Sequence, residues 1–160
     1  MKNTIKISRL QENNLDLFIE LVELFNEVFE EYHTVGSKTH LKKLLIKPEF
    51  HAVIATRDDV MVGGLTAYEL PRYYSDKSEL YIYDMAVKTE LHNQGIGKAL
   101  IGYLKEYGMK NGIETIFVEA HSEEEQAVKF YESTFGKSEK VDHFNLEIKS
   151  TGSKTQITSL

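Results

Sequence analysis

Residues 81–87 read YIYDMAV and, after a short loop, residues 92–100 read HNQGIGKAL. The first stretch alternates like a β-strand, and the second places two glycines before a helical pattern. A strand that leads through a glycine-rich turn into a helix leaves backbone N–H groups without partners at the positive end of the helix dipole. Such an arrangement binds phosphate. Gly95 and Gly97 let a ligand approach the backbone, and Lys98 adds a positive charge.

Two common phosphate-binding loops do not fit this spacing. The dinucleotide fingerprint G-x-G-x-x-G requires a third glycine where Leu100 stands. The P-loop requires a glycine five residues before its Gly-Lys-Ser, and Tyr131 occupies that place before the Gly-Lys-Ser at 136–138. The pattern that remains over residues 92–97 is x-x-x-G-x-G.

Periodicity along the rest of the chain predicts an α/β fold with a mixed sheet. Strand-like patterns occupy residues 4–10, 52–56, 60–70, 79–87, 113–120 and 141–148. Helical spacing occupies residues 14–31, the stretch from Ser37 as N-cap to just before Pro48, residues 95–111, and the stretch from a capping box of Ser122 and Glu125 to Gly136. The order is β-α-α-β-β-β-α-β-α-β, and its second half requires parallel strands joined by right-handed crossovers.

Composition narrows the class of protein. The chain has 160 residues, a net charge of −6 and no cysteine. One domain of this length buries a sufficient core without disulfides, and a cysteine-free chain fits a reducing, cytoplasmic environment. No signal peptide or membrane-spanning run is visible, so we expect no membrane association. The acidic balance disfavours nucleic acid as a partner and favours a cationic ligand.

The x-x-x-G-x-G loop resembles the acetyl-CoA pyrophosphate loop of the GNAT superfamily of N-acetyltransferases. GNAT proteins share the predicted element order, and the context Phe130-Tyr131-x-x-x-Phe135-Gly136 matches a tyrosine on their fourth helix. His92 departs from the family, which usually has Arg or Gln there. The resemblance implies one GNAT domain over residues 1–148, splayed between its fourth and fifth strands, with a polar tail at 149–160.

Within that superfamily, the chain resembles the GNAT-type aminoglycoside 3-N-acetyltransferases. The resemblance rests on Leu70-Pro71-Arg72, on the strand at 78–87 and on His143-Phe144. It implies direct transfer of an acetyl group from acetyl-CoA to a primary amine of an aminoglycoside in a ternary complex. The six histidines form no H-x-x-x-H or comparable cluster, so we expect no metal site. It also raises a homodimer as an expectation. The residues expected at the cofactor are Ala86, Val87, His92, Asn93, Gln94, Gly95, Ile96, Gly97 and Lys98.

Tyr131 and Asp84 are the candidate catalytic residues. The family match assigns Tyr131 the role of general acid for the thiolate of CoA, although the apolar stripe on which it lies is also typical of a core tyrosine. Asp84 alternates in phase with Leu80 and Ile82, so a regular strand places its carboxylate on an apolar face. A carboxylate there either binds a substrate ammonium group and accepts its proton, or pairs with a neighbouring donor.

The candidate substrate residues are Asp84, Glu119, His121 and His143. Acidic residues around Glu119 and over 123–125 create a negative field that attracts polycations, although acids at 123–125 also suit a helix N-terminus. Two rival functions stay open. One is acetylation of another small amine or a protein N-terminus, and the other is a non-catalytic CoA-binding module.

Overall fold

The structure is a computed structural model, and it describes residues 4–150. The elements, in chain order, are β1 (Ile5–Arg9), α1 (Leu15–Phe29), α2 (Lys38–Ile46), β2 (Phe50–Arg57), β3 (Val60–Pro71), β4 (Ser78–Val87), α3 (Ile96–Lys110), β5 (Ile113–Val118) and α4 (Glu125–Phe135). None of the helices within the described residues is long and apolar enough to cross a membrane.

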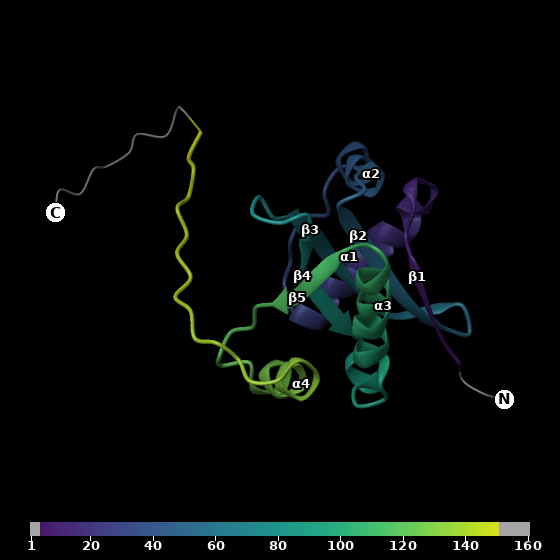
Figure 1. Ribbon diagram of the computed structural model, residues 1–160. Helices are drawn as coiled ribbons and strands as arrows, with labels where there is room; N and C mark the ends of the chain where they lie inside the picture. Colours follow the sequence, from purple (N-terminus) through teal and green to yellow (C-terminus); the bar gives the residue numbers. More distant parts are fainter. Residues whose placement is uncertain (1–3, 151–160) are drawn as a thin grey trace.

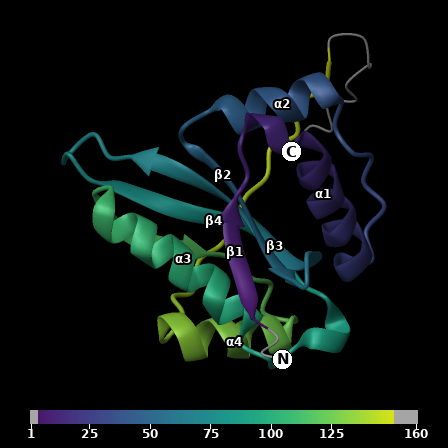
Figure 2. The same ribbon diagram turned by 90° about the vertical axis from the view of Figure 1, so that its right-hand side faces the viewer.

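A five-stranded sheet in the order β1-β2-β3-β4-β5 forms the centre of the fold (Figure 1). Its strands are antiparallel except for β4 and β5, which run parallel on either side of the α3 crossover. Helices α1 and α2 cover one face, and α3 covers the other (Figure 2). The predicted α/β fold with a mixed sheet is confirmed.

Each face of the sheet carries its own apolar core. On the α1 face, the buried side chains of Phe18 and Leu21 pack with that of Ile54. On the α3 face, Leu100 and Leu104 pack with Leu65 of β3. The helical spacing of apolar residues therefore matches the side of each helix that meets the sheet.

The local signals for turns and caps hold at several places. The hairpin between β2 and β3 turns on Asp58 and Asp59, whose positive φ angles of 50° and 60° are those of a two-residue type I′ turn. Ser37 caps α2 because its hydroxyl accepts a hydrogen bond from the amide of His40 at 3.2 Å. Gly136 ends α4 with a φ of 101°.

A β-bulge in β4 overturns the predicted orientation of Asp84. Thr66 pairs with Asp84 and Ala67 pairs with Ile82, so Tyr83 is an extra residue in the strand. The bulge reverses the alternation: Ile82 packs in the α3-face core, whereas Ala86, in phase with Asp84, packs in the α1-face core. Asp84 therefore lies on the α1 face and not beside Ile82.

The sheet opens between β4 and β5, as the resemblance implied. Pairing begins at Ser78 with Ile113 and stops at Ile82 with Val118. Beyond that point β5 ends, so residues 83–87 of β4 have no strand on this side among the described residues. Arg72 fixes the closed end, because its guanidinium contacts Glu79 of β4 at 2.8 Å and also pairs with Glu114 of β5.

Two predicted elements are wrong. The helix α4 begins after Glu124, which makes no side-chain cap, so Ser122 and Glu125 form no capping box. The expected strand at 141–148 is not formed, because a strand needs a partner and this segment runs exposed without pairing to β5. Residues 149 and 150 continue this exposed course, and the rest of the predicted tail lies outside the described residues.

His51 on β2 predicts a loss of stability in mild acid. Its side chain is fully buried beside Arg9 and Tyr107, and burial with the Arg9 charge lowers its pKa from 6.5 to about 4. Because the folded pKa is below the unfolded one, protonation favours unfolding. The stability contributed by neutral His51 is fully present above pH 6.5 and falls by about 3 kcal/mol towards pH 4.

Urea unfolding at a series of pH values measures this effect. Glu and Asp side chains titrate mainly below pH 5, so the informative range is pH 6.5 to 5. A His51→Leu variant, which cannot titrate at this position, should show a flatter stability profile over that range. An unchanged slope in the variant would assign the acid sensitivity to other groups.

Candidate active site

The loop between β4 and α3 presents backbone amides without partners. Gly95 is the N-cap of α3 and has a φ of 82°, a conformation that favours glycine. The amides of the first helical turn, Ile96, Gly97 and Lys98, donate no hydrogen bond within the part of the chain that the structure describes. Three N–H groups thus stand at the positive end of a fifteen-residue helix, as an anion site requires.

The loop is held in shape by its own residues. The ring of His92 hydrogen-bonds through Nε2 to the Val87 carbonyl at 2.9 Å, which fixes the turn that leaves β4. Asn93 has a left-handed φ of 60°, which asparagine tolerates. His92 thereby supports the loop from within, and this contact gives the family departure at this position a structural role.

Gly97 is needed for packing as well as for ligand access. A Cβ atom at this position would lie 2.9 Å from Cζ of Phe130 on α4. A side chain at 97 would therefore push α4 away from the start of α3. Since α4 carries Tyr131, the glycine couples the loop to the candidate acid.

Arg57 is a candidate cofactor residue that the sequence patterns missed. Its two terminal guanidinium nitrogens each donate to Oε1 of Gln94 at 3.0 Å. This contact joins the end of β2 to the loop across 37 residues of sequence. It adds a cation at the loop besides Lys98, and local spacing contains no signal for it.

The open edge of β4 lies directly before this loop. The amide of Lys88 donates to the Val62 carbonyl of β3 at 2.9 Å. Successive amides along a strand point to opposite sides, so the Val87 amide points away from β3, towards the side that β5 has left. Ala86, beside it, is buried. The predicted cofactor residues thus form one continuous track from the opened edge to the start of α3.

The carboxylate of Asp84 is influenced by the charges of the loop that follows α1, which the sequence patterns did not predict as part of the site. After α1, Glu30 adopts a left-handed φ of 53°, and Glu31 and His33 form an ion pair of 2.8 Å. Asn26 anchors this turn by donating to the His33 carbonyl at 2.9 Å. Burial raises the pKa of Asp84, the Glu31 charge raises that pKa further, and His33 opposes both.

Tyr131 lies on α4 and is half-buried against the α3-face core. Its ring contacts Phe130 and Phe135 edge-on, with ring centroids 5.3 Å and 5.9 Å away. Burial, with smaller contributions from Glu124 and Asp84, raises the pKa of Tyr131 to about 12. The hydroxyl therefore keeps its proton at neutral pH, and the Asp84 charge contributes to this shift.

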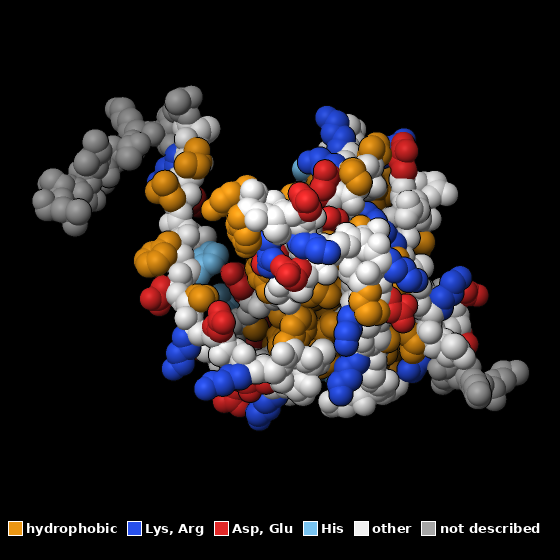
Figure 3. Space-filling view, in the orientation of Figure 1, with side chains coloured by type: hydrophobic (Ala, Val, Ile, Leu, Met, Phe, Trp, Pro, Cys, Tyr) orange, Lys and Arg blue, Asp and Glu red, His pale blue; other side chains and the backbone are white. Residues whose placement is uncertain are grey.

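Glu119 and His143 come together, whereas His121 does not join them. Glu119 accepts from the Tyr81 hydroxyl at 3.4 Å, and its carboxylate lies 3.8 Å from Nδ1 of His143. The side chain of His121 is exposed and has no hydrogen bond or ion pair within residues 4–150. In the space-filling view, a hollow separates the segment that carries His143 from the body of the molecule (Figure 3).

An aromatic wall surrounds these carboxylates. The ring of Tyr81 stacks on that of Phe117, with centroids 4.9 Å apart. It contacts Tyr83 edge-on at a centroid distance of 5.9 Å, and Tyr83 contacts Tyr68 in the same way at 5.8 Å. The three tyrosines and Phe117 therefore line neighbouring strands β3, β4 and β5. The Tyr-Ile-Tyr pattern signalled part of this wall, because alternate residues of a strand share a face.

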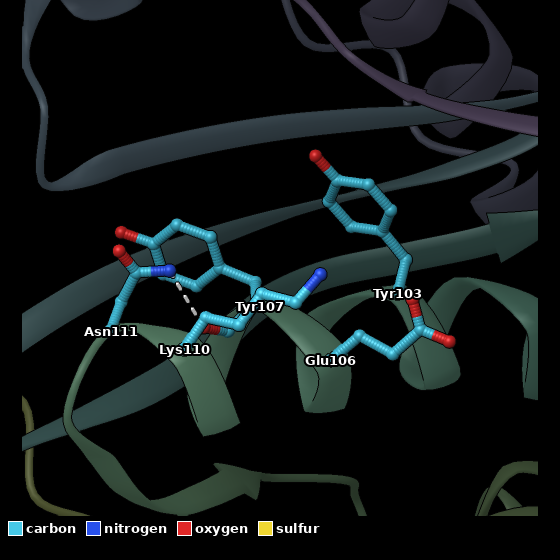
Figure 4. A pocket seen from close by; sticks show the side chains of 5 residues that line it. All are labelled: Tyr103, Glu106, Tyr107, Lys110 and Asn111. Carbon is cyan, nitrogen blue, oxygen red and sulfur yellow. Dashed lines mark hydrogen bonds between the residues drawn. The ribbon is translucent and has the colours of Figure 1, made fainter.

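Two other hollows lie away from this site. One, of about 180 Å³, lies along the C-terminal half of α3, where Asn111 donates to the Tyr107 carbonyl (Figure 4). The other, of about 410 Å³, lies between Lys42 on α2 and residues 11–13. The α3 hollow is at the opposite end of the helix from Gly95. No group of three or more potential metal ligands occurs among residues 4–150.

The chain belongs to the GNAT acetyltransferase family, whose model matches residues 18–136. It is an N-acetyltransferase. No curated protein matches it significantly in sequence.

Solved structures give nearer relatives. The chain is similar to the aminoglycoside acetyltransferase meta-AAC0020, from an uncultured soil metagenomic sample, with 42% identity and a TM-score of 0.88. Two structures of that protein match 92% of this chain. The match covers 99% of the other chain in the complex with trehalose and 98% in the complex with sisomicin. It is also similar to the soil aminoglycoside acetyltransferase HMB0005, with 34% identity over 91% of this chain and 99% of that one, and a TM-score of 0.86.

A more distant structure shares the fold alone. AAC(6')-Iy, in complex with a bisubstrate analogue of CoA and acetylneamine, is 15% identical with a TM-score of 0.76. The match covers 91% of this chain and 99% of that one.

Proposed function

We propose that this enzyme transfers the acetyl group of acetyl-CoA to a primary amine of an aminoglycoside by direct attack in a ternary complex. The observation that carries the proposal is the meeting of two sites at the opened edge of β4. Unpartnered amides lie on one side, at residues 96–98, and carboxylates with tyrosines lie on the other. The similarity to meta-AAC0020 and HMB0005 supports the same acceptor class.

The donor fits the residues of the loop. Acetyl-CoA supplies an activated acetyl thioester and a diphosphate. The amides of Ile96, Gly97 and Lys98 are suited to hold the diphosphate, and the Val87 amide is suited to polarise the thioester carbonyl. Arg57 adds a charge for the phosphates.

The side of the site that carries the carboxylates and tyrosines suits the acceptor. Aminoglycosides are polycations, and Asp84, Glu119 and Glu31 offer three carboxylates near one aromatic wall. The raised pKa of Asp84 suits a group that accepts the proton of the attacking amine. The nitrogen bonds to the thioester carbon, the carbon–sulfur bond breaks, and the Tyr131 hydroxyl stabilises the departing thiolate by donating a hydrogen bond.

Release of free thiol tests the proposal. Purified protein is incubated with acetyl-CoA and gentamicin or sisomicin, and spermidine and a short peptide with a free N-terminus serve as comparison acceptors. We expect rapid thiol release with the aminoglycosides, and product NMR then identifies the acetylated nitrogen. Faster turnover of spermidine or the peptide would favour the rival acceptors. CoA binding without turnover of any amine would favour a non-catalytic module.

Substitution of Arg57 should weaken the donor site. An Arg57→Met variant removes a fixed charge beside Gln94 while keeping much of the aliphatic length. We expect the KM for acetyl-CoA to rise about three- to tenfold at low salt, and the difference to shrink as salt is added. Steady-state kinetics at two ionic strengths measure this. Lys43→Met on α2 is the charge-matched control, and an equal effect in it would remove Arg57 from the site.

A further inference from the structure

Two hydroxyl side chains of β3 lie beside Asp84, and the proposed mechanism does not use them. Phe50 and Ala52 of β2 belong to the α1-face core. They pair with Tyr68 and Thr66 of β3 respectively, so these two side chains point to the same face. Thr66 in turn pairs directly with Asp84 of β4. The strand β3 therefore brings two hydroxyl groups to the face of the sheet on which the Asp84 carboxylate lies.

The position of Tyr68 is set by two neighbouring rings. Its ring lies against that of Phe50, with centroids 5.1 Å apart, and contacts that of Tyr83 edge-on at 5.8 Å. The side chain is half-buried, and burial, with smaller contributions from Tyr83 and Asp84, raises the pKa of Tyr68. The hydroxyl therefore keeps its proton and can donate a hydrogen bond.

The Tyr68 hydroxyl has no protein partner. Hydrogen bonds from tyrosine hydroxyls within residues 4–150 come from Tyr81 and Tyr107, and not from Tyr68. The enclosed side-chain atoms that lack a partner in this part of the chain do not include the Tyr68 oxygen, which therefore reaches open space. A half-buried donor that faces open space beside a carboxylate is available to a ligand.

We propose that Tyr68 is a specificity-determining residue whose hydroxyl donates a hydrogen bond to an oxygen of the acceptor, close to the amine that Asp84 binds. The acceptor class is then an amino alcohol: a primary amine with a hydroxyl or ether oxygen a few bonds from the reacting nitrogen. This inference rests on the proposed function and adds to it the feature by which the site distinguishes an aminoglycoside from a polyamine.

The free energy of the Tyr68 hydroxyl provides the discrimination. An acceptor without a suitable oxygen displaces water from this hydroxyl and leaves it without a partner, which costs binding free energy. A site that hydrogen-bonds a substrate hydroxyl rejects the analogue that lacks it. Charge alone does not make this distinction, because the carboxylates of Asp84, Glu31 and Glu119 attract any polycation.

Steady-state kinetics of Tyr68→Phe test the assignment. Phenylalanine keeps the ring contacts with Phe50 and Tyr83 and removes only the hydroxyl. We expect kcat/KM for sisomicin to fall about tenfold or more, while the KM for acetyl-CoA and any turnover of spermidine stay within about twofold. Tyr73→Phe, which removes a hydroxyl from a side chain that is 98% exposed, is the matched control and should behave as the wild type. Unchanged sisomicin kinetics in Tyr68→Phe, or an equal loss with spermidine, would overturn the proposal.

A pair of small diamines tests the role of the acceptor oxygen directly. 2-Deoxystreptamine, the aminocyclitol of sisomicin, and cis-1,3-diaminocyclohexane have the same ring and amine spacing, but only the first carries hydroxyls. Each is titrated, in the presence of CoA, into ¹⁵N-labelled wild type and Tyr68→Phe. We expect the wild type to bind 2-deoxystreptamine about five- to tenfold more tightly than the diaminocyclohexane, and Tyr68→Phe to lose most of this preference. Equal wild-type affinities, absence of binding by both diamines, or an undiminished preference in Tyr68→Phe would overturn the proposal.

The two experiments separate this inference from the proposed function. If the wild type turns over no aminoglycoside, the proposed acceptor is wrong, and the diamine titrations still decide whether Tyr68 selects an oxygen. If the wild type acetylates sisomicin and Tyr68→Phe does so equally well, the proposed function stands and the role of Tyr68 is wrong.

Discussion

Tyr131→Phe is expected to lower kcat by about a hundredfold or more while leaving CoA affinity nearly unchanged. The proton that Tyr131 retains, through a pKa raised to about 12, is the one that can be shared with the departing thiolate. Phenylalanine keeps the ring contacts to Phe130 and Phe135, so the core of α4 should be preserved.

Pre-steady-state kinetics and calorimetry with CoA separate these two effects. Tyr103→Phe on α3 is the matched control, because it removes a hydroxyl from a tyrosine remote from the start of the helix. It should leave kcat within about twofold. Turnover by the Tyr131 variant within the same range would assign Tyr131 to the core alone and remove it from the chemistry.

Asp84→Asn is expected to reduce kcat/KM by about a thousandfold and to stabilise the folded protein at neutral pH. The asparagine can neither accept a proton nor pair with an ammonium group. Burial and Glu31 raise the pKa of Asp84, so its ionised form is disfavoured in the folded state. Because the folded pKa is above the unfolded one, stability falls as the pH rises from the unfolded pKa to the folded pKa and stays lower above it, and asparagine removes that loss.

The pH dependence of kcat/KM and the melting temperature measure both consequences. Activity of the wild type should fall on the acid side as Asp84 becomes protonated, at a pH above the ordinary pKa of 3.8. The melting temperature of the variant at pH 7.5 should exceed that of the wild type. A destabilised variant that retains activity would indicate that Asp84 pairs with a neighbouring donor and takes no part in catalysis.

The regular parts of this fold could be predicted because their signals are local. The strand, loop and helix at 81–100 depend on glycines and periodicity close in sequence, and the hairpin at Asp58 and Asp59 depends on its own turn. The segment 141–148 has equally good alternation but formed no strand. Alternation shows what a strand would bury, and it does not supply the neighbour that completes the hydrogen bonds.

The part of the site that lies on the strand at 81–87 and on the loop at 92–98 could be predicted from the sequence. One extra residue at Tyr83 changed the face of Asp84, and bulges have no reliable signature in a single sequence. Arg57 reaches Gln94 only because a distant strand ends beside the loop. Glu31 and His33 approach Asp84 because α1 ends in a left-handed turn there. Each of these contacts depends on tertiary structure.

The claim on which the function depends is that the amides at the start of α3 bind the diphosphate of CoA. Titration of ¹⁵N-labelled protein with CoA, followed through its amide resonances, tests that claim directly. The account predicts saturable binding with the largest shifts at Gly95, Ile96, Gly97 and Lys98. Absence of binding, or shifts concentrated elsewhere while these four amides stay unchanged, would contradict it.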